Sequence, residues 1–482
     1  MIRTVESTTE AHERVRQSFR GYAAQIQLRR RSRSGYLSEL VRRYRFHVEP
    51  GSRVLELGVG TGDLLASMAS SRAVGIDVSP EMLAVARAEH PNLELYECSA
   101  ESLDECVQGP FDYIILSDLT VFLYDIQMVL AGLQSLCHSR TRVIFNFHSR
   151  LWQPVLNLLA AFGLHHRHVR TNWVTVEDIT NLLMVAEYNV IATDRSTLIP
   201  AHIPILSTLA NRYLARLPVL SHFCLVNWVI ARPQRALGRA DELSASIVCP
   251  CRNEAGNIPN IVRRTPRLGS LTEIIFVEGG STDGTWDAIQ REVAAGSPNR
   301  VELRAYKQAI KGKADAVRTG FLHATGDILM ILDADLTVPP EDLAAFFDAL
   351  TKGKGEFING SRLVYPMTDD AMRFLNLIGN KFFARVFSYL LAQPIKDTLC
   401  GTKALARSDY ERITRGRTYF GEFDPFGDFD LLFGASKLHL KIIEIPVRYR
   451  GRTYGETQIR RFRDGLLLLQ MCWFGLKRLK LI

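Results

Sequence analysis

The run from Ile328 to Leu332 is the sequence feature that most constrains the fold of this chain. It holds five consecutive apolar residues, begins just after Gly326, and ends at Asp333 and Asp335 in an Asp-x-Asp spacing. An apolar run without polar alternation predicts a strand buried on both faces, as in a parallel sheet covered by helices. The carboxyl ends of such strands face the crevice where α/β sheets bind ligands. We therefore expect Asp333 and Asp335 to bind Mg²⁺ or Mn²⁺, which prefer oxygen ligands.

The length and composition predict more than one domain. The chain has 482 residues, of which 47% are hydrophobic, enough for two or three domains with full cores. Its 8 cysteines show neither paired CxxC spacings nor neighbouring histidines, so we expect reduced thiols without a zinc site or a disulfide framework. No apolar run follows the first residues, which predicts a cytoplasmic protein without a signal peptide.

Charge is concentrated at the two ends of the chain. Residues 1–53 contain twelve Arg and five Glu, and residues 441–482 contain ten Lys or Arg and three Asp or Glu. Basic ends fit nucleic acid or an anionic membrane face. The apolar, aromatic-bearing stretches beside the C-terminal charges favour the membrane, and no recognised nucleic-acid module accompanies them.

A strand, a glycine-rich turn and a second strand open the first half. Helical residues 34–46 are followed by a strand over Arg53 to Leu57 and by the pattern ExGxGxG from Glu56 to Gly62. A second strand ends at Asp77, 21 residues after Glu56, where a carboxylate can accept hydrogen bonds from ribose hydroxyls. Ser79-Pro80 then predicts the start of a helix.

This pattern resembles the class I S-adenosylmethionine-dependent methyltransferases, and the resemblance covers roughly residues 35–232. It implies S-adenosylmethionine as the cofactor. Within the motif, the resemblance places Glu56, Gly58, Gly60 and Gly62 around the methionine part, Asp77 at the ribose, Ser99 in the stretch near the adenine, and Asp118 facing the pocket. Rossmann dehydrogenases are the rival interpretation, which the acid before the first glycine and the GxGxG spacing disfavour.

The methyl acceptor stays open in this half of the chain. Apolar residues at helical spacing predict an amphipathic helix over 202–217, acting as a lid or a surface binder. The stretch Leu225 to Ile230 is typical of the last strand of a sheet.

A polar stretch, Arg232 to Glu242, predicts a domain boundary, after which a new α/β series begins. Strands are expected at Ser246 and at Glu273 to Glu278. Lys311 and Lys313 precede a helix, so that two cations and a helix N-terminus suit a pyrophosphate.

The stretches PCRNEAGNI, FVEGGSTDGT, KGKADAVRTGF and GDILMILDAD, in this order, are similar to those of the GT-A glycosyltransferases of family 2, over about 244–464. Within the family they resemble the dolichyl-phosphate mannose synthase type. The resemblance implies a nucleotide-sugar donor bound by Pro250, Asn253, Glu254, Glu278 and Asp333, with the metal on Asp333 and Asp335.

The stretch Arg448 to Thr457 is similar to the one that in such synthases meets the acceptor phosphate or the leaving diphosphate. Arg452 is the first candidate and Arg450 the second, because guanidinium groups bind phosphate oxygens bidentately. Asp428 and Asp430 lie where other family members keep a catalytic base. A hydroxyl acceptor would need such a base, whereas an acceptor phosphate would not.

Two stretches point to lipid. Residues 371–392 and 465–482 combine apolar and aromatic residues with Lys and Arg, which predicts helices lying in a membrane interface rather than crossing it.

We therefore expect an α/β protein of two doubly wound, Rossmann-like domains, a class I methyltransferase fold followed by a GT-A fold, with C-terminal amphipathic interface helices. The expected parts are a basic segment (1–34), the methyltransferase-like domain (35–232), a linker (233–243), the glycosyltransferase domain (244–464) and a basic amphipathic helix (465–482). The expected function is metal-dependent sugar transfer, with inversion, to a polyprenyl-phosphate-type lipid at the inner face of the membrane, together with methyl transfer. The alternatives are a hydroxyl acceptor on a glycan or protein, and a first domain that is a non-catalytic scaffold.

Overall fold

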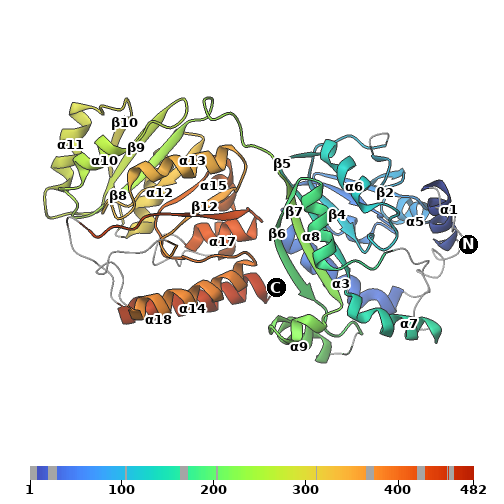
Figure 1. Ribbon diagram of the computed structural model, residues 1–482. Coiled ribbons are helices and arrows are strands. Elements are labelled where there is room, and N and C mark those ends of the chain that lie inside the picture. The colour runs from blue at the N-terminus through green and yellow to red at the C-terminus, as the bar shows by residue number, and fades with distance from the viewer. Residues whose placement is uncertain are drawn as a thin grey trace, which may run out of the picture. The chain divides into compact units, whose positions relative to one another are not determined.

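The computed structural model describes residues 8–19, 30–103, 106–162, 172–201, 203, 205–310, 312–364, 374–420, 429–452, 454 and 461–481. The chain divides into two compact units between Gln234 and Arg235. The described residues of each unit form a seven-stranded sheet flanked by helices (Figure 1). The predicted class of two α/β domains is therefore confirmed.

The sheet of the first unit has the strand order β3-β2-β1-β4-β5-β7-β6. Its strands are β1 (Arg53–Leu57), β2 (Arg72–Asp77), β3 (Glu94–Glu97), β4 (Phe111–Ser117), β5 (Cys137–His148), β6 (Tyr188–Ser196) and β7 (Val226–Pro233). Its helices are α1 (Thr8–Phe19), α3 (Arg30–His47), α4 (Asp63–Ala66), α5 (Pro80–Glu89), α6 (Ile126–Gly132), α7 (Gln153–Ala161), α8 (Val176–Val185) and α9 (Leu206–Arg212). The strand order reverses between β1 and β4, which is where doubly wound sheets bind ligands.

The sheet of the second unit has the order β10-β9-β8-β11-β13-β12-β14. Its strands are β8 (Ala245–Cys251), β9 (Thr272–Glu278), β10 (Glu302–Lys307), β11 (Ile328–Ile331), β12 (Phe357–Ser361), β13 (Lys403–Ala406) and β14 (Ile442–Pro446). Its helices are α10 (Ile258–Arg264), α11 (Thr285–Ala295), α12 (Lys313–His323), α13 (Leu343–Thr351), α14 (Phe374–Leu391), α15 (Arg407–Arg415), α16 (Arg417–Phe420), α17 (Phe429–Lys437) and α18 (Arg461–Gly475).

The apolar run of β11 forms the predicted strand at the centre of this sheet. β11 pairs in parallel with β8 and antiparallel with β13. Residues from Ile328 to Leu332 are at most 1% exposed, and Ile328, Met330 and Leu332 belong to a core that also contains Phe276 and Phe346. The predicted burial on both faces is confirmed, and the strand delivers Asp333 to the carboxyl edge.

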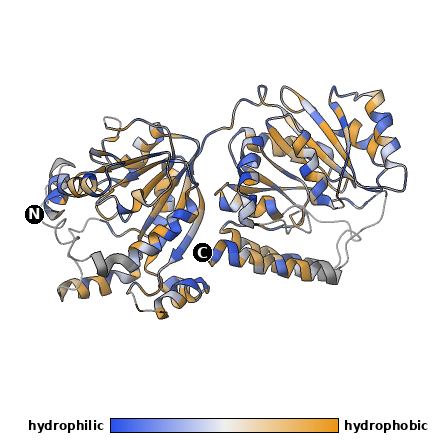
Figure 2. Ribbon diagram, turned by 180° about the vertical axis from the view of Figure 1, so that it is seen from behind, coloured by the Kyte–Doolittle hydropathy of each residue, from blue (hydrophilic) through white to orange (hydrophobic). Residues whose placement is uncertain are grey.

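The predicted interface helices pack against the second unit. The rings of Phe387 (α14), Phe433 (α17) and Phe474 (α18) form a series with centroids 6.0 and 6.2 Å apart, in which Phe387 and Phe433 are buried and Phe474 is half-buried. Other large apolar side chains of α14 and α18 remain exposed, among them Phe382, Leu466, Leu469 and Trp473. Figure 2 shows hydrophobic and hydrophilic residues interspersed along both helices, which lie side by side. The C-terminal helix begins at Arg461, four residues before its predicted start, and the part of the chain that the structure describes contains no helix long and apolar enough to cross a bilayer.

One sequence prediction for the first unit is corrected. The amphipathic pattern over 202–217 gives a helix only from Leu206 to Arg212, because Ile205 has a φ of 65°, which a helix cannot continue through. The predicted last strand of this sheet along the chain is confirmed as β7, which lies antiparallel between β5 and β6.

Candidate active sites

The glycine-rich turn after β1 and the acid at the end of β2 come together in the first unit. Gly58, Gly60 and Gly62 have φ values of 68°, 56° and 78°, which residues with a Cβ rarely adopt. The Asp77 carboxylate accepts hydrogen bonds from the backbone N–H of Gly60 and of Ser79, each at 2.9 Å. The turn and the acid expected at the cofactor are thus joined, and each Asp77 oxygen keeps a lone pair for a further donor.

Glu56 leaves a polar atom unpaired in the same crevice. Its residue is 3% exposed, and its Oε2 has no hydrogen-bond partner among the described residues. Burial, together with the nearby charge of Asp77, raises the pKa of Glu56 well above its ordinary value. A buried carboxyl oxygen without a partner is costly, and a ligand that brings N–H donors relieves that cost. The residues at this crevice therefore fit a ligand with an amino group and a ribose, such as S-adenosylmethionine.

A directed hydrogen-bond network lies at the carboxyl ends of β4 and β5. The Tyr44 hydroxyl donates to Asn146 Oδ1 at 2.5 Å, and Asn146 Nδ2 donates to Asp118 Oδ1 at 2.9 Å. The Tyr36 hydroxyl donates to Asp118 Oδ2 at 2.8 Å and lies 3.3 Å from Nε2 of His148. Sequence reasoning selected Asp118 alone; His148 is the last residue of β5, at the same edge of the sheet.

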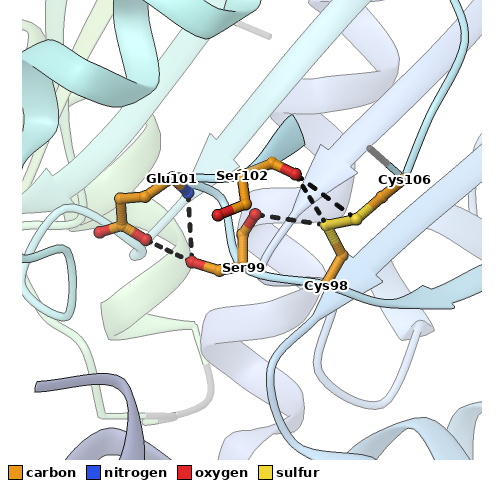
Figure 3. The surroundings of a disulfide bond; sticks show 5 residues. All are labelled: Cys98, Ser99, Glu101, Ser102 and Cys106. Atoms are coloured by element: carbon orange, nitrogen blue, oxygen red, sulfur yellow. Dashed lines mark hydrogen bonds between the residues drawn. A yellow bond between two sulfur atoms is a disulfide. The ribbon is translucent and has the colours of Figure 1, made fainter. Parts of the chain in front are cut away.

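Ser99 lies in a loop that the structure closes covalently. Cys98 and Cys106 form a disulfide, so the expectation that all cysteines are reduced is wrong (Figure 3). Within this loop the Ser99 hydroxyl donates to Glu101 Oε2 at 2.6 Å, and Glu101 Oε1 accepts from the N–H of Tyr124 at 3.0 Å. The disulfide links Cys98, the residue after β3, to Cys106, in the segment before β4. It therefore restrains the stretch that the resemblance places near the adenine.

In the second unit, each carboxylate of the Asp-x-Asp pair is balanced by a cation. Lys313 Nζ, at the start of α12, lies 2.7 Å from Asp333 Oδ1, and Arg452 lies 2.7 Å from Asp335 Oδ2. Burial would raise the pKa of Asp333, but the charges of Lys313 and other nearby cations outweigh it and hold the pKa below its ordinary value. Asp335 Oδ1 also accepts from the hydroxyl of Thr337 at 2.7 Å. Two carboxylates two residues apart, surrounded by cations, fit a divalent ion that shares its shell with a diphosphate.

The loops after β8 and β9 are held together on the expected donor side. Asn253 has a φ of 57° and its side-chain oxygen accepts from the N–H of Thr282 at 2.9 Å. The N–H of Glu254 donates to the Thr285 hydroxyl at 2.9 Å, while the N–H of Ser281 donates to the Glu278 carboxylate at 2.5 Å. These bonds bring Asn253, Glu254 and Glu278 to one edge of the sheet.

Glu254 is electrostatically linked to the metal-site candidates. Burial and the charge of Asp335 raise its pKa to about 7, against the hydrogen bond from Asn257. Tyr454 donates to Asp283, which in turn accepts from the N–H of Ala255, the residue after Glu254. The segment carrying Arg452 therefore reaches both the Asp-x-Asp strand and the donor loops.

The remaining predicted residues lie in different settings. Pro250 is a half-buried residue of β8. The N–H of Arg450 donates to the carbonyl of Thr337 at 2.9 Å. Asp430 is ion-paired with Arg318 and with Arg417, each at 3.1 Å. Lys311 and Asp428 lie outside the described residues.

Sequence reasoning missed the residues on and near β12 and β13 that surround Asp333. Lys403, on β13, is fully buried and its ammonium donates to the carbonyl of Cys400. Arg362, after β12, makes a two-pronged ion pair with Asp397 at 2.7 and 2.8 Å. A Cβ on Gly401 would collide with the Asp333 carboxylate and the Lys313 ammonium. These residues lie far along the chain from Asp333, and no local pattern marks them.

We expect the substitution Gly401→Ala to disable sugar transfer without changing any charge. The added methyl must displace Asp333 or Lys313, and small displacements of reacting groups cost on the order of 100-fold. Donor turnover and thermal unfolding should be measured on the full chain. Gly379→Ala is the matched control, because a Cβ there meets no atom within 4 Å. Equal turnover in the two variants would contradict the assigned site.

We expect the double substitution of Cys98 and Cys106 by Ser to lower Tm. A disulfide closing so short a loop contributes about 2–3 kcal/mol by restricting the unfolded chain. Affinity for S-adenosylhomocysteine should fall as well, because the loop carrying Ser99 gains freedom. Peptide mapping without reductant tests the bond directly, with Cys472→Ser as the control. Free thiols at both positions together with an unchanged Tm would show that the loop is not closed by a disulfide.

Comparison with known proteins finds a family model that matches part of each unit. Residues 54–139 match the family described as methyltransferase domain, and residues 246–414 match glycosyl transferase family 2. Glycosyltransferase AglJ of Haloferax volcanii is 29% identical over 221 residues, which are 45% of this chain and 67% of that protein. The dolichol-phosphate mannosyltransferase of Pyrococcus furiosus is 29% identical over 45% of this chain and 60% of its own length. The polyprenol monophosphomannose synthase of Mycolicibacterium smegmatis is 28% identical over 44% of this chain and 80% of its own. Both predicted resemblances are thereby confirmed, and the chain is an enzyme that combines a methyltransferase domain with a glycosyltransferase family 2 domain.

Proposed function

We propose that the second domain transfers a sugar from a nucleotide sugar to a polyprenyl-phosphate-type lipid, with inversion, and that the first transfers a methyl group from S-adenosylmethionine. The observation that carries the first part is the pairing of Asp333 with Lys313 and of Asp335 with Arg452. The relatives from Pyrococcus furiosus and Mycolicibacterium smegmatis are named for dolichol phosphate and polyprenol, which supports a lipid phosphate as acceptor.

In this proposal, different residues of the second domain bind the nucleoside, the metal ion and the diphosphate. Asn253, Glu254 and Glu278, with Pro250, bind the nucleoside part of the donor. Asp333 and Asp335 hold Mg²⁺ or Mn²⁺, which stabilises the charge of the leaving diphosphate when bound. Lys313, with Lys311, at the N-terminus of α12 offers its ammonium and the backbone N–H groups of that turn to the diphosphate.

Arg452 positions the acceptor phosphate against the anomeric carbon. Its guanidinium is already at the metal-site edge, 2.7 Å from Asp335. The phosphate arrives as an anion, so its oxygen attacks without a general base, the bond to the diphosphate breaks with its electron pair, and one displacement inverts the anomeric centre. The two guanidinium groups on Asp430 keep that carboxylate engaged, which disfavours Asp430 as the base that a hydroxyl acceptor would need.

The first domain binds the methyl donor in the crevice between β1 and β2. Gly58, Gly60 and Gly62 allow the close approach of the methionine part, Glu56 accepts from its amino group, and Asp77 accepts from the ribose. Ser99 belongs to the disulfide-closed loop on the adenine side. We keep the predicted bounds 35–232 and 244–464 as the proposed extents of the two catalytic domains.

Peripheral attachment to an anionic membrane completes the proposal. Large apolar side chains remain exposed on α14 and α18, and the exposed Lys477 and the half-buried Arg478 follow α18 directly. Apolar side chains beside cations suit the headgroup boundary of an anionic bilayer.

We expect Arg452→Ala to be far more damaging than Asp430→Asn. Loss of a charged partner of a buried phosphate costs about 2–5 kcal/mol, or roughly 30- to 4,000-fold. Asp430→Asn should lower Tm, because two guanidinium groups lose their counter-charge, but it should change turnover much less. Transfer to a polyprenyl phosphate in detergent measures both effects, and Arg239→Ala, whose side chain is 72% exposed, is the control. The opposite ranking in folded variants would favour a hydroxyl acceptor with Asp428 or Asp430 as its base.

We expect the triple substitution of Phe382, Leu466 and Trp473 by Ser to release the protein from vesicles of anionic lipid. Each side chain is more than half exposed, so the fold should be retained, while each contributes about 1 kcal/mol or more to insertion. Sedimentation should show at least roughly tenfold weaker binding. Leu322→Ser, at a residue that is 79% exposed on α12, is the control. Unchanged binding of the triple variant would refute attachment through these helices.

A further inference from the structure

The hydrogen bonds at the carboxyl ends of β4 and β5 have a fixed direction from donor to acceptor. Tyr44 is fully buried, and burial together with the charges of Glu56 and Asp118 raises its pKa well above its ordinary value. Tyr44 therefore stays protonated and donates to Asn146 Oδ1, which turns the Asn146 amide N–H groups toward Asp118. Asp118 accepts from Asn146 on one oxygen and from Tyr36 on the other, as an ionised carboxylate does.

This direction determines which nitrogen of His148 carries the proton. Since the Tyr36 hydroxyl donates its hydrogen bond to Asp118, its oxygen acts as the acceptor toward Nε2 of His148, which lies 3.3 Å away. Asp118 Oδ1 is 3.8 Å from the same nitrogen. In the neutral imidazole the proton therefore lies on Nε2, and Nδ1 keeps its lone pair. Within the described part of the chain Nδ1 has no hydrogen-bond partner, and the side chain is 28% exposed.

The position of His148 faces the acceptor side of the domain. The donor crevice lies at β1 and β2, while Asp118 and His148 follow β4 and β5, on the other side of the point where the strand order reverses. A base there meets a group that approaches the methyl group from the side opposite its sulfur. Asp118 stabilises the imidazolium that forms, as the carboxylate does in other His–carboxylate pairs.

The segments that follow His148 along the chain and that precede its partner on β7, Val226, carry exposed apolar side chains. The chain runs from His148 into α7, and Trp152 Nε1 donates to the carbonyl of Phe223 at 2.9 Å, which joins this segment to the one before β7. Leu151, Leu158 and Phe223 are 64%, 59% and 57% exposed. Figure 1 shows α7 and α9 at the same end of the domain. The sequence has no Asp or Glu from Ser149 to Val176 or from Arg195 to Ala240.

We propose that His148 is the general base of the methyltransferase domain and that its acceptor is a neutral hydroxyl on an amphiphilic molecule, such as a glycolipid. This inference rests on the proposed methyl transfer. The acceptor hydroxyl loses its proton to Nδ1, its oxygen forms the bond to the methyl carbon, and the carbon–sulfur bond breaks with its electron pair remaining on sulfur. A carboxylate or phosphate acceptor would need no base, so a built base indicates an acceptor that carries a proton.

The first test is independent of turnover. Nitrogen NMR of the full chain with labelled histidine, with His148→Gln to assign the signal, should show Nδ1 unprotonated and Nε2 protonated in neutral His148. Tyr36→Phe should shift this tautomer balance. A protonated Nδ1 in the wild-type protein would overturn the assignment.

The second test measures methylation of octyl glucoside and octyl mannoside against the free sugars and octylamine. The wild type should prefer the octyl glycosides, and His148→Gln should lose about 10²–10⁴-fold in turnover while its calorimetric affinity for S-adenosylhomocysteine is unchanged. Added imidazole should partly restore His148→Gly, which a merely structural role would not allow. Near-normal turnover in His148→Gln, or a wild type that binds S-adenosylhomocysteine but methylates only octylamine or no hydroxyl, would overturn the proposal. Absence of S-adenosylhomocysteine binding would instead refute the proposed methyl transfer itself.

Discussion

The balance of two carboxylates by two cations at the end of β11 is the interaction on which the glycosyltransferase domain depends. A strand buried on both faces delivers Asp333 and Asp335 to an edge where unpaired charges would be costly. Lys313 comes from the start of α12 and Arg452 from the segment after β14, so three distant parts of the chain must converge. Because ammonium and guanidinium groups also bind phosphate oxygens, the same cations suit the donor diphosphate and the acceptor phosphate.

The methyltransferase domain also has carboxylates at the edge of its sheet, but different groups pair with them. Its acids also stand at or near the carboxyl ends of parallel strands, but backbone amides hold Asp77, and Asn146 with Tyr36 holds Asp118. Among the described residues, one buried oxygen of Glu56 has no partner, as expected where a ligand supplies the donor. In our proposal the methyl donor binds at β1 and β2 and the acceptor at β4 and β5.

Local signals in the sequence were sufficient for the fold and for the strand ends. Three features are each encoded by residues close together in the sequence, and the structure forms all three: the apolar run of β11, the glycine turn after β1 and the Ser79 cap of α5. Features that depend on distant contacts were not predictable in this way. The bond between Cys98 and Cys106 has no diagnostic spacing, Gly401 and Lys403 reach Asp333 only in three dimensions, and the backbone at Ile205 breaks a helix that hydrophobic spacing alone predicted.

The central claim is that one chain glycosylates a lipid phosphate and also methylates an acceptor. Mass spectrometry of the products formed by the full chain tests it most directly, with a panel of nucleotide sugars, a polyprenyl phosphate, a divalent cation and S-adenosylmethionine. The account predicts a polyprenyl phosphate carrying one added sugar, formed only with the divalent cation, and a separate mass increase of one methylene on a hydroxyl-bearing product when S-adenosylmethionine is present. Sugar appearing on a protein or glycan hydroxyl, with none on the lipid phosphate for any donor, would contradict it.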